Sequence, residues 1–160
     1  MTIQSGDRLP SVTLMQMRDG APRAVKTDEL FAGKQVVLFA LPGAFTPTCS
    51  AKHLPGFIQH AAEFTEKGVD FIACVSVNDA FVMGAWGNAQ GANDHVMMLA
   101  DGNAEFTKAV GLEMDATKFG MGLRSQRYAM LIEDGIVQKL FVEESGAFSV
   151  SSAEHMLREI

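Results

Sequence analysis

Cysteine is scarce in this chain, and its scarcity excludes one class of protein. Only two cysteines, Cys49 and Cys74, occur among the 160 residues. Two thiols are too few to hold a small disulfide scaffold together, so each has to be interpreted from its own surroundings. In a reducing compartment a cysteine is more plausibly catalytic or simply packed in the core.

Basic side chains and long apolar runs are also in short supply. Lysine and arginine number 13 against 19 aspartates and glutamates, which gives a formal net charge of −6. With no sequence-wide positive field we expect neither nucleic acid nor a membrane surface as a partner. No stretch approaches the roughly 18 apolar residues that cross a bilayer, and residues 1–8 lack the features of a secretory signal. We therefore expect a cytoplasmic protein.

No internal repeat, low-complexity tract or linker divides the sequence. A content of 48% hydrophobic and 20% charged residues is that of an ordinary globular protein. Domains usually contain roughly 100 to 200 residues, so the length suits one core. We predict a single domain over residues 1–160.

Strand and helix patterns alternate along this domain. Apolar runs predict strands over 12–17, 35–41, 69–77 and 95–100. Apolar residues at helical spacing, with capping and terminating residues, predict helices over 27–33, 48–68, 79–89 and 104–110. Pro55 and Gly56 should bend the helix over 48–68. Asp134 and Gly135 supply the turn of a hairpin between strands 127–132 and 136–142.

The chain is predicted to end in one more helix. Ser151 or Ser152 caps it, and Glu154 completes a capping box if Ser151 is the cap. Parallel units followed by a hairpin and a helix predict an α/β protein with a mixed central sheet sandwiched by helices. This is the arrangement of a thioredoxin-like fold.

Cys49 is the strongest candidate for chemistry. It follows a loop rich in turn residues and stands where the helix over 48–68 begins. Unpaired amide groups at a helix start stabilise the thiolate, which is the attacking form of cysteine. Thr46 is close enough in the loop to point its hydroxyl at the sulfur, and Pro42 and Pro47 hold the loop rigid. The alternative is a cysteine that only fills space at a helix start.

The residues around Cys49 form a long motif, which reads Pro42-Gly43-Ala44-Phe45-Thr46-Pro47-Thr48-Cys49-Ser50 and continues as His53-Leu54-Pro55-Gly56. This motif resembles the active-site segment of the peroxiredoxins, and in particular of the type V thiol peroxidases. The resemblance extends through 75–79, 81–86 and 123–128. It implies a peroxidase that reduces hydrogen peroxide or an alkyl hydroperoxide through a sulfenic acid on Cys49, with no metal and no bound organic cofactor.

The same resemblance implies a catalytic site formed by Pro42, Thr46, Cys49 and Arg127, with Arg124 in a supporting role. Physical chemistry agrees, because a fixed cation near sulfur favours the thiolate and a planar guanidinium can hold the peroxide oxygens. Without the resemblance, Arg127 is better interpreted as a surface charge at the start of a strand.

Cys74 belongs to the apolar strand over 69–77, where a thiol is usually an inert, buried hydrophobe. Many type V relatives resolve the sulfenic acid with a cysteine between the last strand and the last helix, but residues 145–152 contain none. We therefore expect a one-cysteine cycle in which glutathione with glutaredoxin, or thioredoxin, regenerates the thiol. A redox relay that passes oxidation from Cys49 to a protein partner is the alternative. A disulfide reductase is disfavoured, because Lys52 occupies the second position of a Cys-x-x-Cys motif.

His53 follows Cys49 by one helical turn, so it is a candidate base. The favoured role is support of the site by packing or a hydrogen bond. Cys49, His53 and His60 also suggest zinc, but the second closely spaced pair of ligands is missing.

Two further features concern other kinds of binding. Gly120-Met121-Gly122 lacks the ending of a phosphate loop, and we interpret it as a flexible approach to Arg124. The resemblance implies a homodimer, for which Phe45 and Trp86 are apolar candidates.

Overall fold

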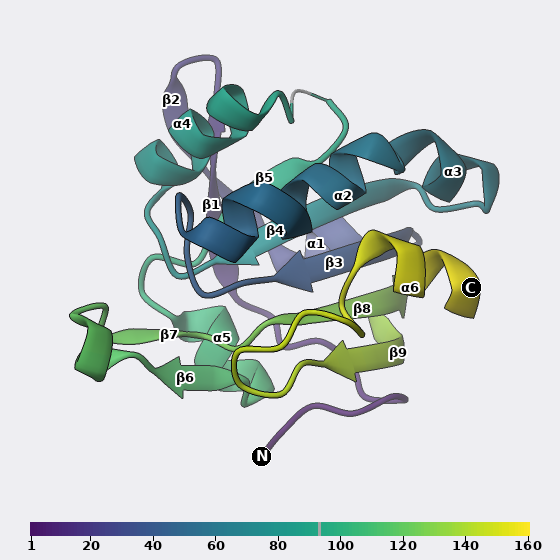
Figure 1. Cartoon of the computed structure of the whole chain (residues 1–160). Coiled ribbons are helices and arrows are strands. Elements are labelled where there is room, and N and C mark those ends of the chain that lie inside the picture. The colour runs from purple at the N-terminus through teal and green to yellow at the C-terminus, as the bar shows by residue number, and fades with distance from the viewer. Residues whose placement is uncertain (93) are drawn as a thin grey trace.

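The computed structural model describes residues 1–92 and 94–160 (Figure 1). Within them one sheet has the strand order β2-β1-β5-β4-β3-β8-β9. The central strands β3, β4 and β5 are parallel, and the other neighbours pair antiparallel. The strands of this sheet are β1 (Thr13–Arg18), β2 (Ala21–Lys26), β3 (Gln35–Ala40), β4 (Phe71–Ser76), β5 (Met97–Ala100), β8 (Tyr128–Glu133) and β9 (Ile136–Val142).

Helices cover both faces of the sheet, and a small second sheet pairs β6 (Glu113–Asp115) with β7 (Leu123–Ser125). The helical elements are α1 (Thr27–Phe31), the π-helical turn η1 (Cys49–His53), α2 (Leu54–Gln59), α3 (Ala61–Glu66), α4 (Ala80–Gln90), α5 (Glu105–Val110), the 3₁₀ turn η2 (Thr117–Phe119) and α6 (Ala153–Glu159). None of the helices found in residues 1–92 and 94–160 has the length and apolar content needed to span a bilayer.

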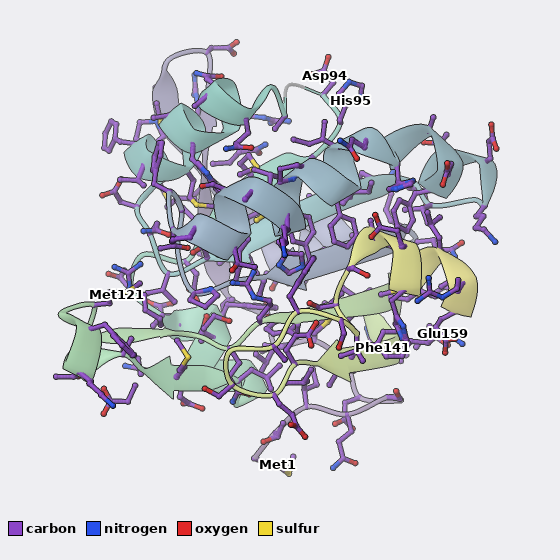
Figure 2. All side chains as sticks on the ribbon, in the orientation of Figure 1. Met1, Asp94, His95, Met121, Phe141 and Glu159 are labelled. Atoms are coloured by element: carbon purple, nitrogen blue, oxygen red, sulfur yellow. The ribbon has the colours of Figure 1, made fainter. Side chains whose placement is uncertain are left out.

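Two apolar layers hold the helices on the sheet, and their side chains fill the space between helix and strand (Figure 2). Successive side chains of a strand point to opposite faces, so β3 contributes to both layers. Val37 and Phe39 join the layer beneath α2, α3, α4 and α6, whereas Val36 and Leu38 join the layer beneath α1 and α5. The predicted mixed sheet sandwiched by helices, with a thioredoxin-like arrangement, is therefore confirmed.

The predicted hairpin is confirmed in detail. Asp134 and Gly135 have φ values of 50° and 76°, the left-handed pair that a tight turn between twisted strands needs. The predicted helix over 48–68 is divided in the structure. The π turn η1 passes into α2 at Leu54, beside Pro55, which has no N–H to continue the hydrogen bonds of the preceding turn, and His60 separates α2 from α3. The sequence predicts an irregularity near Pro55 and gives no signal for the one at His60.

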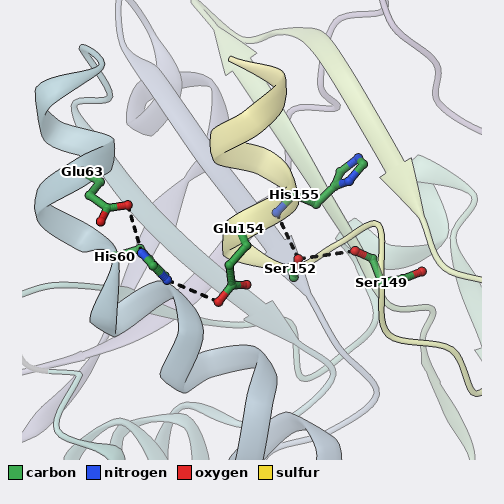
Figure 3. A network of polar contacts seen from close by, with 6 residues as sticks. All are labelled: His60, Glu63, Ser149, Ser152, Glu154 and His155. Carbon is green, nitrogen blue, oxygen red and sulfur yellow. Dashed lines mark hydrogen bonds and ion pairs between the residues drawn. The ribbon is translucent and has the colours of Figure 1, made fainter.

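Of the two predicted caps of the last helix, the structure selects the second. Ser152 is the cap, because its Oγ accepts a 3.1 Å hydrogen bond from the backbone N–H of His155. Glu154 therefore makes no capping box. Figure 3 shows it instead beside His60, whose Nε2 lies 3.3 Å from Oε1 of Glu154 while Nδ1 lies 3.0 Å from Oε2 of Glu63. This cluster connects α6 to the break between α2 and α3.

Candidate active site

The loop that leaves β3 delivers Cys49 to the first position of η1. The backbone N–H of Leu54 donates to the carbonyl of Cys49, the wide hydrogen-bonding pattern of a π turn, and such turns are frequent at functional sites. The side chain of Cys49 is 0% exposed. Phe45 takes a left-handed φ of 64°, which turns the loop toward the helix.

Arg127 reaches the sulfur because of strand register. β8 pairs antiparallel with β3, and Ala40 at the end of β3 lies opposite Tyr128 at the start of β8. The residues just after β3 and just before β8 therefore meet at one edge of the sheet. Nη2 of Arg127 donates a 3.2 Å hydrogen bond to Sγ of Cys49.

His53 is held between Arg127 and the loop that precedes α6. Its Nδ1 lies 2.9 Å from Nη1 of Arg127 and its Nε2 lies 3.0 Å from the carbonyl oxygen of Ser151. A guanidinium only donates and a carbonyl only accepts, so these partners select the neutral ring with the proton on Nε2. Burial first, and the Arg127 charge second, lower the pKa of His53 to about 3, against the opposing effect of the Ser151 carbonyl. This ring supports Arg127, and its Nδ1 lone pair is already engaged, which argues against a role as a base.

Thr46 does not direct its hydroxyl at the sulfur as expected. Its Oγ1 donates to the carbonyl of Gly43 at 2.6 Å, because the loop turns tightly there, and no Thr46 bond to Cys49 occurs within the described residues. Arg124 supports the same loop. Its Nη1 donates to the carbonyl of Pro42 at 3.3 Å, and a Cβ on Gly43 would lie 2.7 Å from that nitrogen, so a larger residue at position 43 would displace the guanidinium of Arg124.

Cys74 and Trp86 are both buried. Cys74 is 0% exposed on the central strand β4, and burial first, then the neighbouring Cys49, raise the pKa of its thiol despite the opposing charge of Arg127. Trp86 is 0% exposed, so it cannot offer the surface for a second copy that the sequence suggested. Its indole N–H instead donates to Oγ of Ser50 at 3.0 Å and ties α4 to η1. Phe45, at 57% exposure, remains on the surface.

Three residues around the site were not predicted to belong to it, and all lie in the segment between β9 and α6. Phe148 packs its ring against His53 with centroids 5.1 Å apart, and the guanidinium carbon of Arg127 lies 5.9 Å from its centroid. Ser151 supplies the carbonyl that holds His53, and Glu143 accepts hydrogen bonds from the segment. A polar loop without periodicity gives no hint that it folds inward.

No metal site emerges from the described residues. Among residues 1–92 and 94–160 no three His, Cys, Asp or Glu side chains are grouped to hold an ion. His60, which the zinc hypothesis placed with Cys49 and His53, turns instead to Glu63 and Glu154.

This chain is similar to known proteins over nearly its whole length. The model of the Redoxin family matches residues 4–157. Peroxiredoxin-2E-2, chloroplastic, of Oryza sativa subsp. japonica is 56% identical over 99% of this chain and 73% of its own length. The crystal structure of reduced Prx3 in complex with H₂O₂ from Vibrio vulnificus is 57% identical, covers 99% of both chains and has a TM-score of 0.95. A Burkholderia cenocepacia structure described as a thioredoxin reductase is 50% identical over 100% of this chain and 99% of its own, with a TM-score of 0.97.

The family match and the sheet order together define a redoxin with a thioredoxin-like fold. The chain belongs to the peroxiredoxin family, whose members are thiol-dependent peroxidases and thus oxidoreductases. The family implies a peroxide substrate and a thiol reductant such as thioredoxin. The reductase name belongs to the Burkholderia protein.

Proposed function

We propose that this peroxiredoxin reduces hydrogen peroxide and alkyl hydroperoxides through a sulfenic acid on Cys49. The supporting contact is the 3.2 Å hydrogen bond from Nη2 of Arg127 to Sγ of Cys49 in a buried site. The thiolate attacks the terminal peroxide oxygen, so that an S–O bond forms as the O–O bond breaks. The departing oxygen takes a proton and leaves as water or an alcohol. The Arg127 cation stabilises the negative charge that develops on that oxygen.

In this proposal Thr46 and Pro42 face the hydroperoxide that reaches the sulfur. Because the Thr46 hydroxyl gives its hydrogen to Gly43, its oxygen can accept a hydrogen bond from the O–H of a hydroperoxide. Pro42 has no N–H that could compete for the substrate, and its carbonyl is engaged by Arg124. Arg124 and His53 act as supports that hold the loop and Arg127.

The cycle we propose uses one cysteine. Cys74 is fully buried on β4, where burial disfavours its thiolate, and residues 143–152 contain no thiol. Glutathione would attack the sulfenic sulfur, release water and leave a mixed disulfide, which the thiolate of glutaredoxin then takes over. Thioredoxin is the second candidate reductant.

One equivalent of hydrogen peroxide tests this cycle. Intact mass spectrometry in the presence of a sulfenic-acid trap should find a single adduct on Cys49. Addition of glutathione instead of the trap should give a mixed disulfide that glutaredoxin removes. A rapid, stoichiometric bridge between Cys49 and Cys74 would refute the one-cysteine cycle.

A peroxide-sensing relay is the alternative function for the same oxidised Cys49. Both functions share the first step and differ in what removes the oxidation. Repeated turnover with hydroperoxide and a small-thiol or thioredoxin system supports the peroxidase. Oxidation without turnover, followed by disulfide transfer to a protein, would favour the relay.

Three finer assignments belong to the same proposal. The motif from Pro42 to Ser50 supports the type V subfamily. Exposed Phe45 beside the active-site loop supports a homodimer through this surface, which sedimentation at micromolar concentration tests. Two free cysteines suit a reducing compartment such as the cytoplasm, which cell fractionation tests.

A further inference from the structure

Glu143 is a buried carboxylate at the end of β9 that the peroxidase mechanism does not use. It is 7% exposed, and within the described residues no lysine, arginine or histidine forms an ion pair with it. Its Oε2 instead accepts hydrogen bonds from the backbone N–H of Ser149 at 2.7 Å, the backbone N–H of Ser151 at 2.8 Å and Oγ of Ser151 at 2.7 Å. The single oxygen Oε2 of Glu143 therefore holds together the two ends of the loop over residues 143–151, which leads to α6.

A continuous set of polar contacts leads from this carboxylate to the sulfur. The carbonyl of Ser151 accepts from Nε2 of His53 at 3.0 Å. Nδ1 of His53 accepts from Nη1 of Arg127 at 2.9 Å, and Nη2 of the same guanidinium contacts Sγ of Cys49 at 3.2 Å. The backbone N–H of Glu143 also donates to the carbonyl of Arg127 at 2.9 Å, so the two residues are fixed to each other.

We propose that Glu143 is a positioning residue for peroxide reduction, acting through Ser151 and His53 on the guanidinium of Arg127. The role rests on the proposed function of Cys49 and Arg127. A carboxylate that holds both the N–H and the hydroxyl of Ser151 fixes the direction of the Ser151 carbonyl. That carbonyl selects the ring proton of His53 and leaves Nδ1 free to accept from Arg127.

The charge on Glu143 is part of this arrangement. Burial alone would raise the pKa of Glu143, but the hydrogen bonds from Ser151 and Ser149 outweigh it and lower the pKa. The carboxylate is therefore ionised at neutral pH and accepts charge-assisted bonds, which are stronger than those to a neutral oxygen. Glu143→Gln keeps the size of the side chain and one oxygen that can replace Oε2 as acceptor, but it removes the negative charge that strengthens the three hydrogen bonds.

A double-mutant cycle separates positioning from mere loop stability. Glu143→Gln should lower the second-order rate of peroxide reduction by about tenfold, the lower end of the effect that outer partners of metal ligands have on the groups they orient. In a His53→Gln background the same substitution should lower the rate much less, because the contact of the His53 ring with Arg127 has already been removed. Glu144→Gln, which changes an exposed carboxylate one position further on, should leave the rate unchanged. An equal loss in both backgrounds, or an unchanged rate for Glu143→Gln, would overturn the proposal.

A second readout does not need activity. Nitrogen NMR of the His53 ring should show the proton on Nε2 in the wild type and a mixture of the two neutral forms in Glu143→Gln. Ser151→Ala, which removes the Oγ bond but keeps the backbone, should give a smaller shift in the same direction and guards against misfolding of Glu143→Gln. A wild-type ring spectrum in both variants would overturn the positioning role. Failure of the wild type to consume peroxide would refute the proposed function, and the ring spectra would still decide the role of Glu143.

Discussion

Arg127→Met removes the cation from the sulfur while keeping a flexible side chain in the same space. Nη2 of Arg127 lies 3.2 Å from Sγ of Cys49, and Nη1 lies 2.9 Å from Nδ1 of His53. A hydrogen bond to a charged group contributes about 1.5 to 3 kcal/mol, and about 1.36 kcal/mol of barrier corresponds to a tenfold change in rate. If that energy is lost entirely from the transition state, the rate falls by roughly 10- to 160-fold. Lost stabilisation of the developing oxyanion extends this toward about 1,000-fold.

Stopped-flow mixing of reduced protein with hydrogen peroxide measures this loss in a single turnover. Arg127→Lys should fall between the wild type and Arg127→Met, because an ammonium keeps the charge but cannot bind Cys49 and His53 through one planar fork. Arg124→Met is the matched control, since Arg124 contacts the carbonyls of Pro42 and Met121 and not the sulfur. If Arg127→Met has a native circular dichroism spectrum and loses no more activity than Arg124→Met, the assigned role is wrong.

Three other perturbations test separate parts of the structure. Cys49→Ser should abolish peroxide consumption and Cys74→Ala should preserve most of it, so equal losses in two folded variants would contradict the assignment. The pKa of His53 is about 3 in the folded protein against 6.5 in the unfolded chain, so the free energy of unfolding should decrease as pH falls below about 6.5 and level off near pH 3, with about 2 kcal/mol lost between pH 7 and pH 5. Urea unfolding of His53→Gln should lack that loss, and an identical pH dependence would show that another group titrates. If the proposed homodimer forms through Phe45, Phe45→Glu should shift sedimentation from dimer to monomer, and a dimer that persists would place the contact elsewhere.

The sequence could predict the strands and helices whose apolar side chains are buried in the core, because burial leaves a complete hydrophobic pattern in the sequence. β3 and β4 lie at the centre of the sheet and are covered on both faces, so both appear as continuous apolar runs. β2 had no such signal, because it is an edge strand with mostly exposed side chains and contains Pro22. β6 and β7 were missed for a similar reason, since each is only 3 residues long and largely outside the core.

The candidate site was predictable through the motif and the resemblance that it carries, which also implies Arg127, whereas the residues alone give no reason for Arg127 to lie near the sulfur. Cys49, Thr46 and Pro42 belong to one contiguous segment, but the position of Arg127 depends on which strand pairs with β3. That pairing is tertiary: Ala40 opposite Tyr128 brings Arg127 beside a loop that is far away in sequence. The turn of Thr46 toward Gly43 is a matter of loop geometry within a few residues, which periodicity does not report.

The segment 143–152 shows most clearly why a polar loop can be misread. Its Glu, Ser and Gly residues are typical of a solvated connection, yet Glu143 is drawn inward because its backbone N–H pairs with the carbonyl of Arg127 at 2.9 Å. The carboxylate then takes three hydrogen bonds from Ser149 and Ser151, and a loop held in this way resists opening. Residues 143–152 contain no cysteine, so this loop cannot supply a thiol that forms a disulfide with Cys49. Both properties favour regeneration of the sulfur by a thiol that arrives from outside the chain.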